Sequence, residues 1–459
     1  MARNNKRNRS GSRANTGDGC GGIVEEVPLE VIGDILSRVG VARDVIRASL
    51  TCSKWREAYL KHLHTLSFNV DDDEHVYREL PTCDLEMLIT KTLFQSPGLR
   101  RLSILMDEKH IFTATSVVGW LMFSRETLSE LFYKARTSQP IDVLDVFGRQ
   151  RLETLSLCDY TVTGVVPNFK RFPCLTSLSL CDVSIPVEGL QRLLLAIPKL
   201  EHVELTDMFL WGLNDDVYSA KVTVKLHCPS LKFLSLTHLQ PMDFILENGS
   251  RIEYVRVTRC GFCLFKIGGS KTLRHFNMSC ARALLLEIED GDNLESLEIT
   301  RSDVAQSNLF PMKIRAPKLK TFRIWDSKIV EKGKGLVVDL EPLAVGSPQL
   351  SHLAIFCDNG SFCNISFGFS LSLEKVWVLE IGWEWDYIDG FCEWTEKVLR
   401  CCPNVRKLIV HGVVPKEASI PCPSKYLEDF GEHTSSMFEM MRKYQHIQVQ
   451  FVFKYQLYA

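Results

Sequence analysis

The chain has 459 residues, 45% of them hydrophobic and 24% charged, which are the proportions of a globular protein long enough for more than one domain. Its formal net charge of −2 argues against a global electrostatic attraction to nucleic acid or to an anionic membrane surface. No apolar run approaches the roughly 20 residues needed to cross a bilayer, so we expect neither a membrane nor a nucleic acid among its partners.

Residues 1–22 are polar, basic and rich in glycine, and we expect a disordered tail because they cannot bury a core. Lys6, Arg7 and Arg9 leave open a nuclear-import signal, although a solvated tail is the simpler interpretation. The tail lacks the apolar core of a signal peptide, so the 16 cysteines of the chain are interpreted as reduced thiols. The expected location is the cytoplasm, the nucleus or both.

Residues 25–64 are predicted to form a separate unit of three short helices. Pro28 suits the start of the first helix and Gly40 its end. The apolar residues between them share one stripe at helical spacing, namely Val31, Ile32, Ile35, Leu36 and Val39. Asp44 is placed to cap a second helix, and a third passes through Trp55. So small a unit should lean on the rest of the chain, on a partner or on both.

Four segments of this unit resemble the F-box, and they are Val27-Pro28-Leu29-Glu30-Val31-Ile32, Ile35-Leu36-Ser37-Arg38-Val39, Asp44-Val45 and Cys52-Ser53-Lys54-Trp55-Arg56. They follow the Leu-Pro opening, Ile-Leu-Ser centre and Cys-Lys/Arg-x-Trp close of that family, with mild departures at Val27 and at Ser53-Lys54. The resemblance implies docking onto the Skp-family adaptor of an SCF ubiquitin ligase, and through it onto a cullin and a RING subunit. Some of the implied residues must hold the helices together instead. The adaptor-binding residues that it implies are Val27, Pro28, Leu29, Ile32, Ile35, Leu36, Val39, Val45, Cys52 and Trp55.

Residues 65–425 are organised by one repeated pattern, in which apolar residues stand at positions 0, +3 and +5. The copies begin at Leu99, Leu152, Leu175, Leu200, Leu231, Ile252, Leu273, Leu294, Leu319, Leu350, Leu373 and Val405, with a weaker copy at Leu128 and a first strand at 64–73. Because strand side chains alternate between faces, +3 and +5 are inward positions of a short strand. The pattern resembles the leucine-rich repeat, although the usual Asn or Cys at +8 is mostly missing. The expected fold is therefore α/β, with the F-box followed by a horseshoe-shaped solenoid of irregular repeats.

The segments that join the repeats are predicted to be helical at both ends of the solenoid and extended in its middle. Helical spacing follows Pro186 and begins again at Phe391. The segments that alternate like strands are 221–229, 263–269, 283–290 and 311–317. Residues 426–459 should cap the open end of the solenoid, with a partial repeat at 426–430, a helix at 437–444 and a strand at 447–453.

The sequence contains no recognisable catalytic motif, since GxSxG, the P-loop, HExxH and GxGxxG are all missing. Cys260 and Cys263 have the spacing of metal ligands, but no second pair follows in register, and core cysteines are the simpler interpretation. We therefore expect a non-enzymatic protein without a cofactor or a metal.

Positions +2, +4 and +6 of each repeat should point onto the concave face of the horseshoe. They are small and hydroxylated in the early repeats, whereas the later repeats carry aromatic and arginine side chains, which are typical interface anchors. The substrate-binding residues predicted on this basis are Tyr254, Arg256, Arg323, Trp325, Phe356 and Trp377. For Trp325 and Trp377, burial beneath a neighbouring loop is an equally good alternative.

An F-box followed by degenerate leucine-rich repeats resembles the plant F-box/LRR proteins. This resemblance implies the substrate-recognition subunit of an SCF-type E3 ubiquitin ligase, which presents an unknown protein substrate for ubiquitination. Two alternatives stay open, a ligase-independent scaffold for protein interactions and a small-molecule-sensing F-box receptor. The second alternative would need a basic pocket for an inositol phosphate, and the sequence offers no matching cluster of lysine and arginine.

Overall fold

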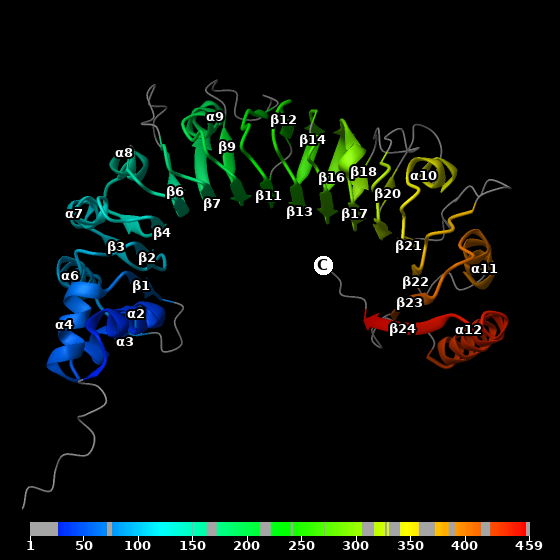
Figure 1. The fold of residues 1–459 in the computed structure, drawn as a ribbon, viewed down its shortest axis with the longest axis horizontal. Helices are drawn as coiled ribbons and strands as arrows, with labels where there is room; N and C mark the ends of the chain where they lie inside the picture. The colour runs from blue at the N-terminus through cyan, green and yellow to red at the C-terminus, as the bar shows by residue number, and fades with distance from the viewer. Residues whose placement is uncertain are drawn as a thin grey trace, which may run out of the picture.

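The computed structural model describes residues 26–70, 76–148, 150–162, 172–211, 222–239, 242–269, 271–304, 316–325, 328–329, 340–357, 372–384, 391–414 and 423–455. These residues form an open arc, with one long sheet on its concave surface and with helices and a second sheet on its convex surface (Figure 1). The α/β class with a long parallel sheet is therefore confirmed. The tail at 1–22 and most of the segment at 311–317 lie outside the described residues.

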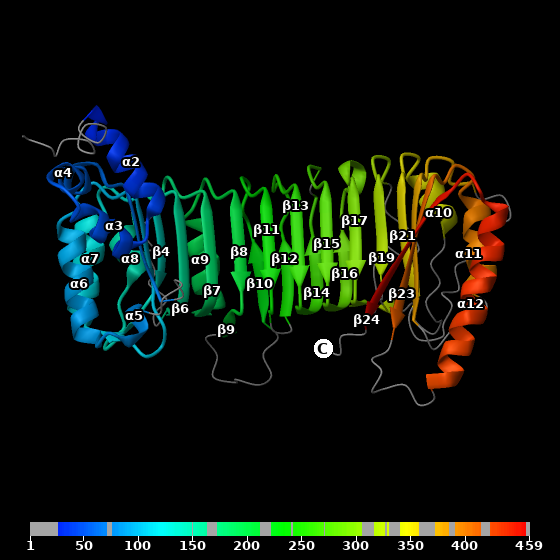
Figure 2. The ribbon, with the colours of Figure 1, turned by 90° about the horizontal axis from the view of Figure 1, so that it is seen from below.

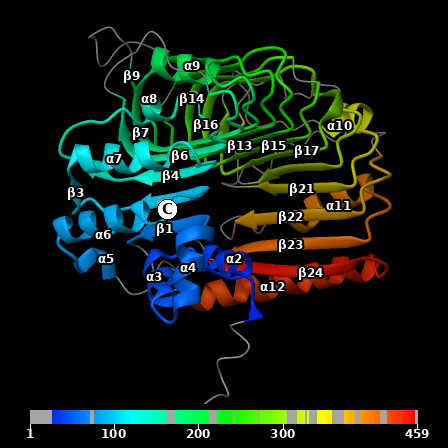
Figure 3. The same ribbon diagram turned by 60° about the vertical axis from the view of Figure 1, so that its left-hand side comes forward.

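Within the described residues, the concave sheet contains fifteen parallel strands in chain order, and β9 (Phe209–Trp211) pairs beside β7. The fifteen are β1 (Thr65–Asn69), β2 (Arg101–Leu105), β4 (Glu130–Lys134), β6 (Thr154–Thr161), β7 (Ser177–Pro186), β8 (His202–Thr206), β11 (Phe233–Thr237), β13 (Tyr254–Thr258), β15 (His275–Ser279), β17 (Ser296–Thr300), β19 (Thr321–Trp325), β21 (His352–Cys357), β22 (Val378–Glu384), β23 (Lys407–Val414) and β24 (Gln448–Tyr455). The strands lie side by side along the arc (Figure 3). Equivalent positions of successive strands pair with each other, so they stand in rows across the sheet.

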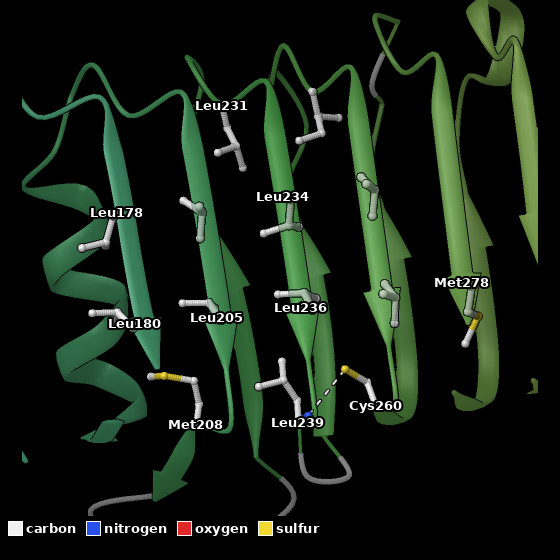
Figure 4. Close-up of a cluster of buried hydrophobic side chains, with 14 of the residues drawn as sticks. Leu178, Leu180, Leu205, Met208, Leu231, Leu234, Leu236, Leu239, Cys260 and Met278 are labelled. Carbon is white, nitrogen blue, oxygen red and sulfur yellow. Dashed lines mark hydrogen bonds between the residues drawn. The ribbon is translucent and has the colours of Figure 1, made fainter. Parts of the chain in front are cut away.

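The inward positions of the repeat form the core between the two layers, as the triplet predicts. Leu178 and Leu180 of β7 and Leu234 and Leu236 of β11 are all buried, and their side chains stack from one strand to the next (Figure 4). The weaker copy is also a strand, since Tyr133 of β4 is buried. A single strand could not bury its apolar side, whereas stacked repeats share one continuous core.

The turn after the inner strand is regular in seven consecutive repeats, from β6 to β17, although the expected Asn or Cys is mostly missing. Position +7 has a left-handed backbone with φ between 50° and 54° at Asp159, Asp182, Asp207, His238, Arg259, Cys280 and Arg301. The N–H of this residue donates to the +6 carbonyl of the next repeat, as from His238 to Thr258 at 3.0 Å. The +8 side chain is buried, and at Cys260 its Sγ accepts from the N–H of Leu239 at 3.5 Å (Figure 4). Burial raises the pKa of Cys260 to about 11, in keeping with a structural thiol.

The convex face is helical at both ends of the arc and extended in its middle, as predicted. The first half carries α5 (Val76–Glu79), α6 (Thr82–Phe94), α7 (Ala114–Ser124), α8 (Val143–Phe147), α9 (Val187–Leu195) and the short pair β3 (Ile111–Phe112) and β5 (Arg136–Thr137). The middle carries the sheet of β10 (Thr223–Leu226), β12 (Met242–Leu246), β14 (Gly261–Ile267), β16 (Arg282–Ile288), β18 (Asp303–Val304) and β20 (Lys328–Ile329), and the 3-10 turn η1 (Gly291–Asn293). The last part carries α10 (Leu340–Gly346), α11 (Phe391–Cys401) and α12 (Pro423–Lys443). A repeat as short as those in the middle leaves little room for a helix beside its strand and turns.

Three helices cover the N-terminal edge of the concave sheet, and they are α2 (Leu29–Val39), α3 (Ala42–Ser49) and α4 (Ser53–His62). The backbone N–H of Ser67 in β1 donates to the carbonyl of Gly40 at 2.7 Å, and the N–H of His64 donates to Ser37 Oγ at 2.9 Å. These bonds attach the helical unit to the edge strand, so it does lean on the repeats. Asp44 does not cap α3, because the helix begins two residues earlier at Ala42.

The C-terminal end forms a complete repeat rather than the predicted partial one. Residues 426–430 belong to α12, which begins at Pro423, well before the helix expected at 437–444. The apolar spacing of 426–430 fits a helix as well as a partial repeat, and α12 continues through these residues. The strand β24 then pairs in parallel with β23 and extends the same sheet. None of the described helices is both long and apolar enough to cross a membrane.

The repeat predicted to begin at Leu373 has a different register in the structure. Leu353 of β21 pairs with Leu379 of β22, so the triplet is Val376, Leu379 and Ile381, all of them buried. Both assignments satisfy the spacing 0, +3 and +5, and the sequence pattern alone could not separate them. The correction places Glu380 on the concave face and removes Trp377 from it.

Candidate functional site

The helix α2 lies at the N-terminal end of the arc (Figure 2). It carries an exposed apolar surface. Val31, Ile35 and Val39 are spaced i, i+4 and i+8 and are 42–45% exposed, and Pro28 is exposed one turn before them. We call Pro28, Val31, Ile35 and Val39 the α2 stripe. Because Ile32 and its neighbours already bury the opposite side of the helix, the stripe is apolar surface that the fold of the chain does not use.

The residues implied to bind the adaptor divide into surface and core. Ile32, Leu36 and Val45 are at most 1% exposed and hold the helices together, so we correct their assignment to core residues. Val27, Leu29 and Trp55 are partly buried against the same core, whereas Cys52 is exposed. Val31 was not among the implied residues, although its place four residues before Ile35 marks it as a member of the exposed side of the helix.

The position of the α2 stripe depends on a close crossing of α2 and α4. Gly33 lies at the crossing, where a Cβ would overlap both the Cβ and the carbonyl oxygen of His62. Only a glycine therefore lets the two helices approach this closely. The crossing fixes which side of α2 is turned outward.

Among the described residues, four arginine–aromatic pairs line the concave sheet and its edge. They are Arg101 on Phe132, Arg256 on Tyr254, Arg323 on Trp325 and Arg406 on Trp377, with the guanidinium carbon 4.9, 5.6, 5.4 and 5.5 Å from the ring centre. Two of the arginines are neutralised within the chain, since Arg101 Nη1 lies 3.3 Å from Glu130 Oε2 and Arg323 pairs with Glu380. We call a pair closed when a carboxylate neutralises its arginine, and open when its arginine has no acidic partner among the described residues. The concave sheet and its edge contain both kinds.

The central cluster consists of Arg256 and a row of four aromatic rings on neighbouring strands. The rings of His202, Phe233, Tyr254 and His275 follow one another with centres 5.8, 5.2 and 5.8 Å apart, and Phe233 and Tyr254 are stacked. The row exists because in-register strands repeat about every 4.8 Å. Arg256 Nη2 donates to the Tyr254 hydroxyl at 3.1 Å. The structure thus brings together two of the predicted substrate-binding residues.

The C-terminal cluster consists of Arg323, Trp325, His352, Glu380 and His411. The carboxylate of Glu380 pairs with Arg323 and lies 3.0 Å from Nε2 of His352 and 3.5 Å from Nε2 of His411. Arg323 reaches it across β21, where the intervening residue is the fully buried Ala354. The rings of Trp325 and His411 meet edge to face, with centres 4.6 Å apart.

The carboxylate of Glu380 is held in its ionised form. Burial alone would raise its pKa, but the hydrogen bond with His352, the approach of the His411 ring and the charge of Arg323 outweigh burial and hold the pKa of Glu380 well below its usual range. The charge of Arg323 is consequently compensated inside the chain. Arg323 and Trp325 do come together as predicted, but within a network centred on a residue that the sequence analysis missed.

The last two predicted substrate-binding residues are not part of these clusters. The backbone of Phe356 belongs to β21, and its side chain lies outside the described residues. Trp377 precedes β22 and is 53% exposed, so it lies at the edge of the sheet beside Arg406 and not at the predicted concave position. The error follows directly from the register of this repeat.

Comparison with known proteins gives a consistent picture. No protein-family model matches the chain. It is 41% identical over 433 residues to the Arabidopsis thaliana F-box/LRR-repeat protein At1g67190, a match that covers 94% of this chain and all of that relative. It is 26% identical over 242 residues to the F-box/FBD/LRR-repeat protein At1g13570 of the same plant, covering 51% of this chain and 53% of that relative.

Proposed function

Since the chain belongs to the F-box/LRR-repeat proteins, we propose that it is the substrate-recognition subunit of an SCF-type E3 ubiquitin ligase in the cytoplasm or nucleus. The N-terminal helices bind a Skp-family adaptor, and through it a cullin and a RING subunit, while the concave face binds a protein substrate. The observation that carries the proposal is the α2 stripe, an exposed apolar surface on a helix whose other side is already buried.

The α2 stripe suits a docking surface in its size and its chemistry. Burying what remains exposed of Val31, Ile35 and Val39 would contribute roughly 1 kcal/mol for each side chain. Interfaces concentrate their binding energy in a few such central residues. The core residues behind the stripe, among them Ile32 and Leu36, hold the helix rigid, which lowers the entropic cost of docking.

The chain itself performs no chemistry in this role. It is a rigid connection between the adaptor-bound end of the arc and the concave face, and it raises the effective concentration of substrate lysines near an activated ubiquitin. The continuous sheet from β1 to β24 supports the proposal, because the docking helices hydrogen-bond directly to its first strand.

The test is the affinity of the purified full chain for a Skp-family adaptor, measured by titration calorimetry. We expect the double variant Val31→Asp, Ile35→Asp to lose at least about 100-fold in affinity, because two charges would be placed in an apolar interface. Leu195→Asp is the matched control, since Leu195 is an exposed apolar residue on α9, away from the stripe. Binding by the double variant as tight as wild type would refute the proposal.

Point variants are preferable to deletion of the N-terminal helices. Deletion would uncover the edge of β1 and the buried Leu63, so loss of binding could simply follow from misfolding. A folded wild-type chain that fails to bind any Skp-family adaptor would instead favour the ligase-independent scaffold.

A further inference from the structure

The four arginine–aromatic pairs differ in whether a carboxylate neutralises them. Arg101 and Arg323 have acidic partners. Arg256 and Arg406 form no ion pair with any of the described residues. Arg406 stacks on Trp377 at the edge of the sheet, whereas Arg256 lies in the middle of the concave face. Arg256 is therefore the one whose position and free charge both suit the substrate site.

The surroundings of Arg256 hold its guanidinium in place without consuming its charge. The phenol ring of Tyr254 lies beside the guanidinium, and its hydroxyl accepts one of the five N–H donors. Glu298, two strands away, is occupied by Asn277 Nδ2 at 3.3 Å and by Ser296 Oγ at 3.2 Å. The remaining donors of Arg256 form a planar fork of the kind that binds carboxylates in a bidentate manner.

From this arrangement we infer that Arg256 binds the carboxylate of an aspartate or glutamate in an extended peptide segment of the substrate. The inference rests on the proposed function, because it identifies the class of segment that the concave face would recognise. The acidic residue would stand beside an aromatic or large apolar residue that packs on the row of Phe233, Tyr254 and His275, whose side chains are partly exposed.

Two further features favour a peptide. A row of hydroxyl side chains runs beside Arg256 at position +6, where it can hydrogen-bond to the backbone of an extended segment, and it comprises Thr206, Thr237, Thr258, Ser279 and Thr300. The carboxylates of Glu204 and Glu298 lie two strands away on either side of Arg256. Such neighbours would repel a polyanion, so the site suits a single negative charge with an apolar neighbour.

The experiment selects peptides from a random phage-displayed library of about twelve residues on the immobilised full chain. Three forms of the chain are compared, namely wild type, Arg256→Gln and the matched control Arg101→Gln. The control removes an arginine that also stacks on an aromatic ring of the concave sheet but already has an acidic partner. We expect Asp or Glu next to an aromatic residue to be enriched on wild type and on the control, and not on Arg256→Gln.

A synthetic peptide from the selection then gives the coupling between the two charges. We expect Arg256→Gln and an Asp→Asn change in the peptide each to lower affinity at least about tenfold, and the two changes together to lower it little further. Arg256→Lys should recover only part of the affinity, because an ammonium group lacks the planar fork. A phosphoserine in place of the aspartate should bind more weakly, and tighter binding would overturn the carboxylate assignment in favour of a phosphate.

The inference is overturned if no peptide is enriched, if the enriched peptides lack an acidic residue, or if Arg256→Gln binds them as wild type does. Adaptor binding is measured on the same samples and should not change in Arg256→Gln. The variant Val31→Asp, Ile35→Asp should bind the peptide normally. Failure of the peptide site and failure of adaptor docking are therefore separate results.

Discussion

The central and C-terminal clusters of the concave face both contain an arginine beside an aromatic residue, but only the C-terminal arginine is neutralised by a carboxylate. In each, an arginine at position +4 stacks on an aromatic residue of its own strand, Arg256 on Tyr254 and Arg323 on Trp325. Arg323 then crosses Ala354 to reach Glu380, whereas Arg256 forms no ion pair among the described residues, although Glu204 and Glu298 stand two strands away on either side. The first arginine is available to a ligand, and the second stabilises the arc.

The difference shows that residue type alone does not identify a binding residue in a solenoid. Both arginines are predicted to contact substrate because both are typical interface anchors at an outward position of a concave strand. What separates them is whether the glutamate two strands away pairs with the arginine. Glu380 pairs with Arg323, whereas neither Glu204 nor Glu298 forms a described ion pair with Arg256. A test of the comparison must therefore change that neighbour and measure stability and binding separately.

The largest expected effect on stability comes from removing the carboxylate of the C-terminal cluster. Glu380→Gln would leave the partly buried Arg323 without its counter-charge, and we expect a loss of roughly 2–3 kcal/mol in the free energy of unfolding. Chemical denaturation at neutral pH measures it. The matched change Glu204→Gln, at the corresponding position two strands from Arg256, should cost less than about 0.5 kcal/mol because Glu204 is exposed. Equal losses in the two variants would contradict the distinction between the clusters.

The residue beneath the ion pair should be nearly as sensitive. Ala354→Leu would place a larger side chain in a fully buried position between Arg323 and Glu380, and we expect a loss of about 2 kcal/mol from overpacking and displacement of the pair. Ser235→Leu is the control, since Ser235 occupies the same position between Glu204 and Arg256 and is only partly buried. If Ala354→Leu left the free energy of unfolding unchanged, the ion pair of Arg323 and Glu380 would contribute little to stability.

The contribution of the C-terminal cluster to the free energy of unfolding should decrease as the pH falls. The pKa of Glu380 is lowered in the folded chain, so its contribution is present above its unfolded value of about 4.3 and is lost as the pH falls toward the folded value. Between about pH 6 and about pH 4 the stability advantage of wild type over Glu380→Gln should shrink by roughly 0.6 kcal/mol. Denaturation curves of both proteins across this range measure it, and an advantage that grew in acid would have the wrong sign.

The smallest effect on stability is expected from substitution of Arg256. Arg256→Gln should change the free energy of unfolding by less than about 0.5 kcal/mol, since Arg256 is exposed and its one described hydrogen bond is to Tyr254. The same denaturation assay measures this change. A large loss of stability in this variant would show that Arg256 has a structural role, as Arg323 does, and would contradict the distinction between the two clusters.

Much of this architecture could be predicted from the sequence because it depends on local spacing. The triplet of apolar residues located the strands, and the length of each repeat indicated whether its outer segment is a helix or a strand. Tyr254 and Arg256 could be placed together because residues two apart share one face of a strand. These conclusions need no knowledge of which strands are neighbours.

The rest depended on contacts between distant segments. The spacing 0, +3 and +5 fits Leu373 and Val376 equally well as a starting point, and only pairing with β21 decides in favour of Val376. Glu380 was therefore missed as the centre of a cluster. On α2, Val31 and Ile32 are adjacent and both apolar, so the sequence does not show which of them faces inward. The packing of α2 against α4 and β1 sets the rotation of the helix and buries Ile32.

The claim that the chain docks through its N-terminal end can be tested most directly by hydrogen–deuterium exchange, with and without a saturating Skp-family adaptor. We predict that the adaptor slows amide exchange in α2 while exchange in β11, β13 and β15, around the central cluster, is unchanged. Slower exchange in the central strands with no change in α2 would contradict the account, since the adaptor would then cover the face assigned to the substrate.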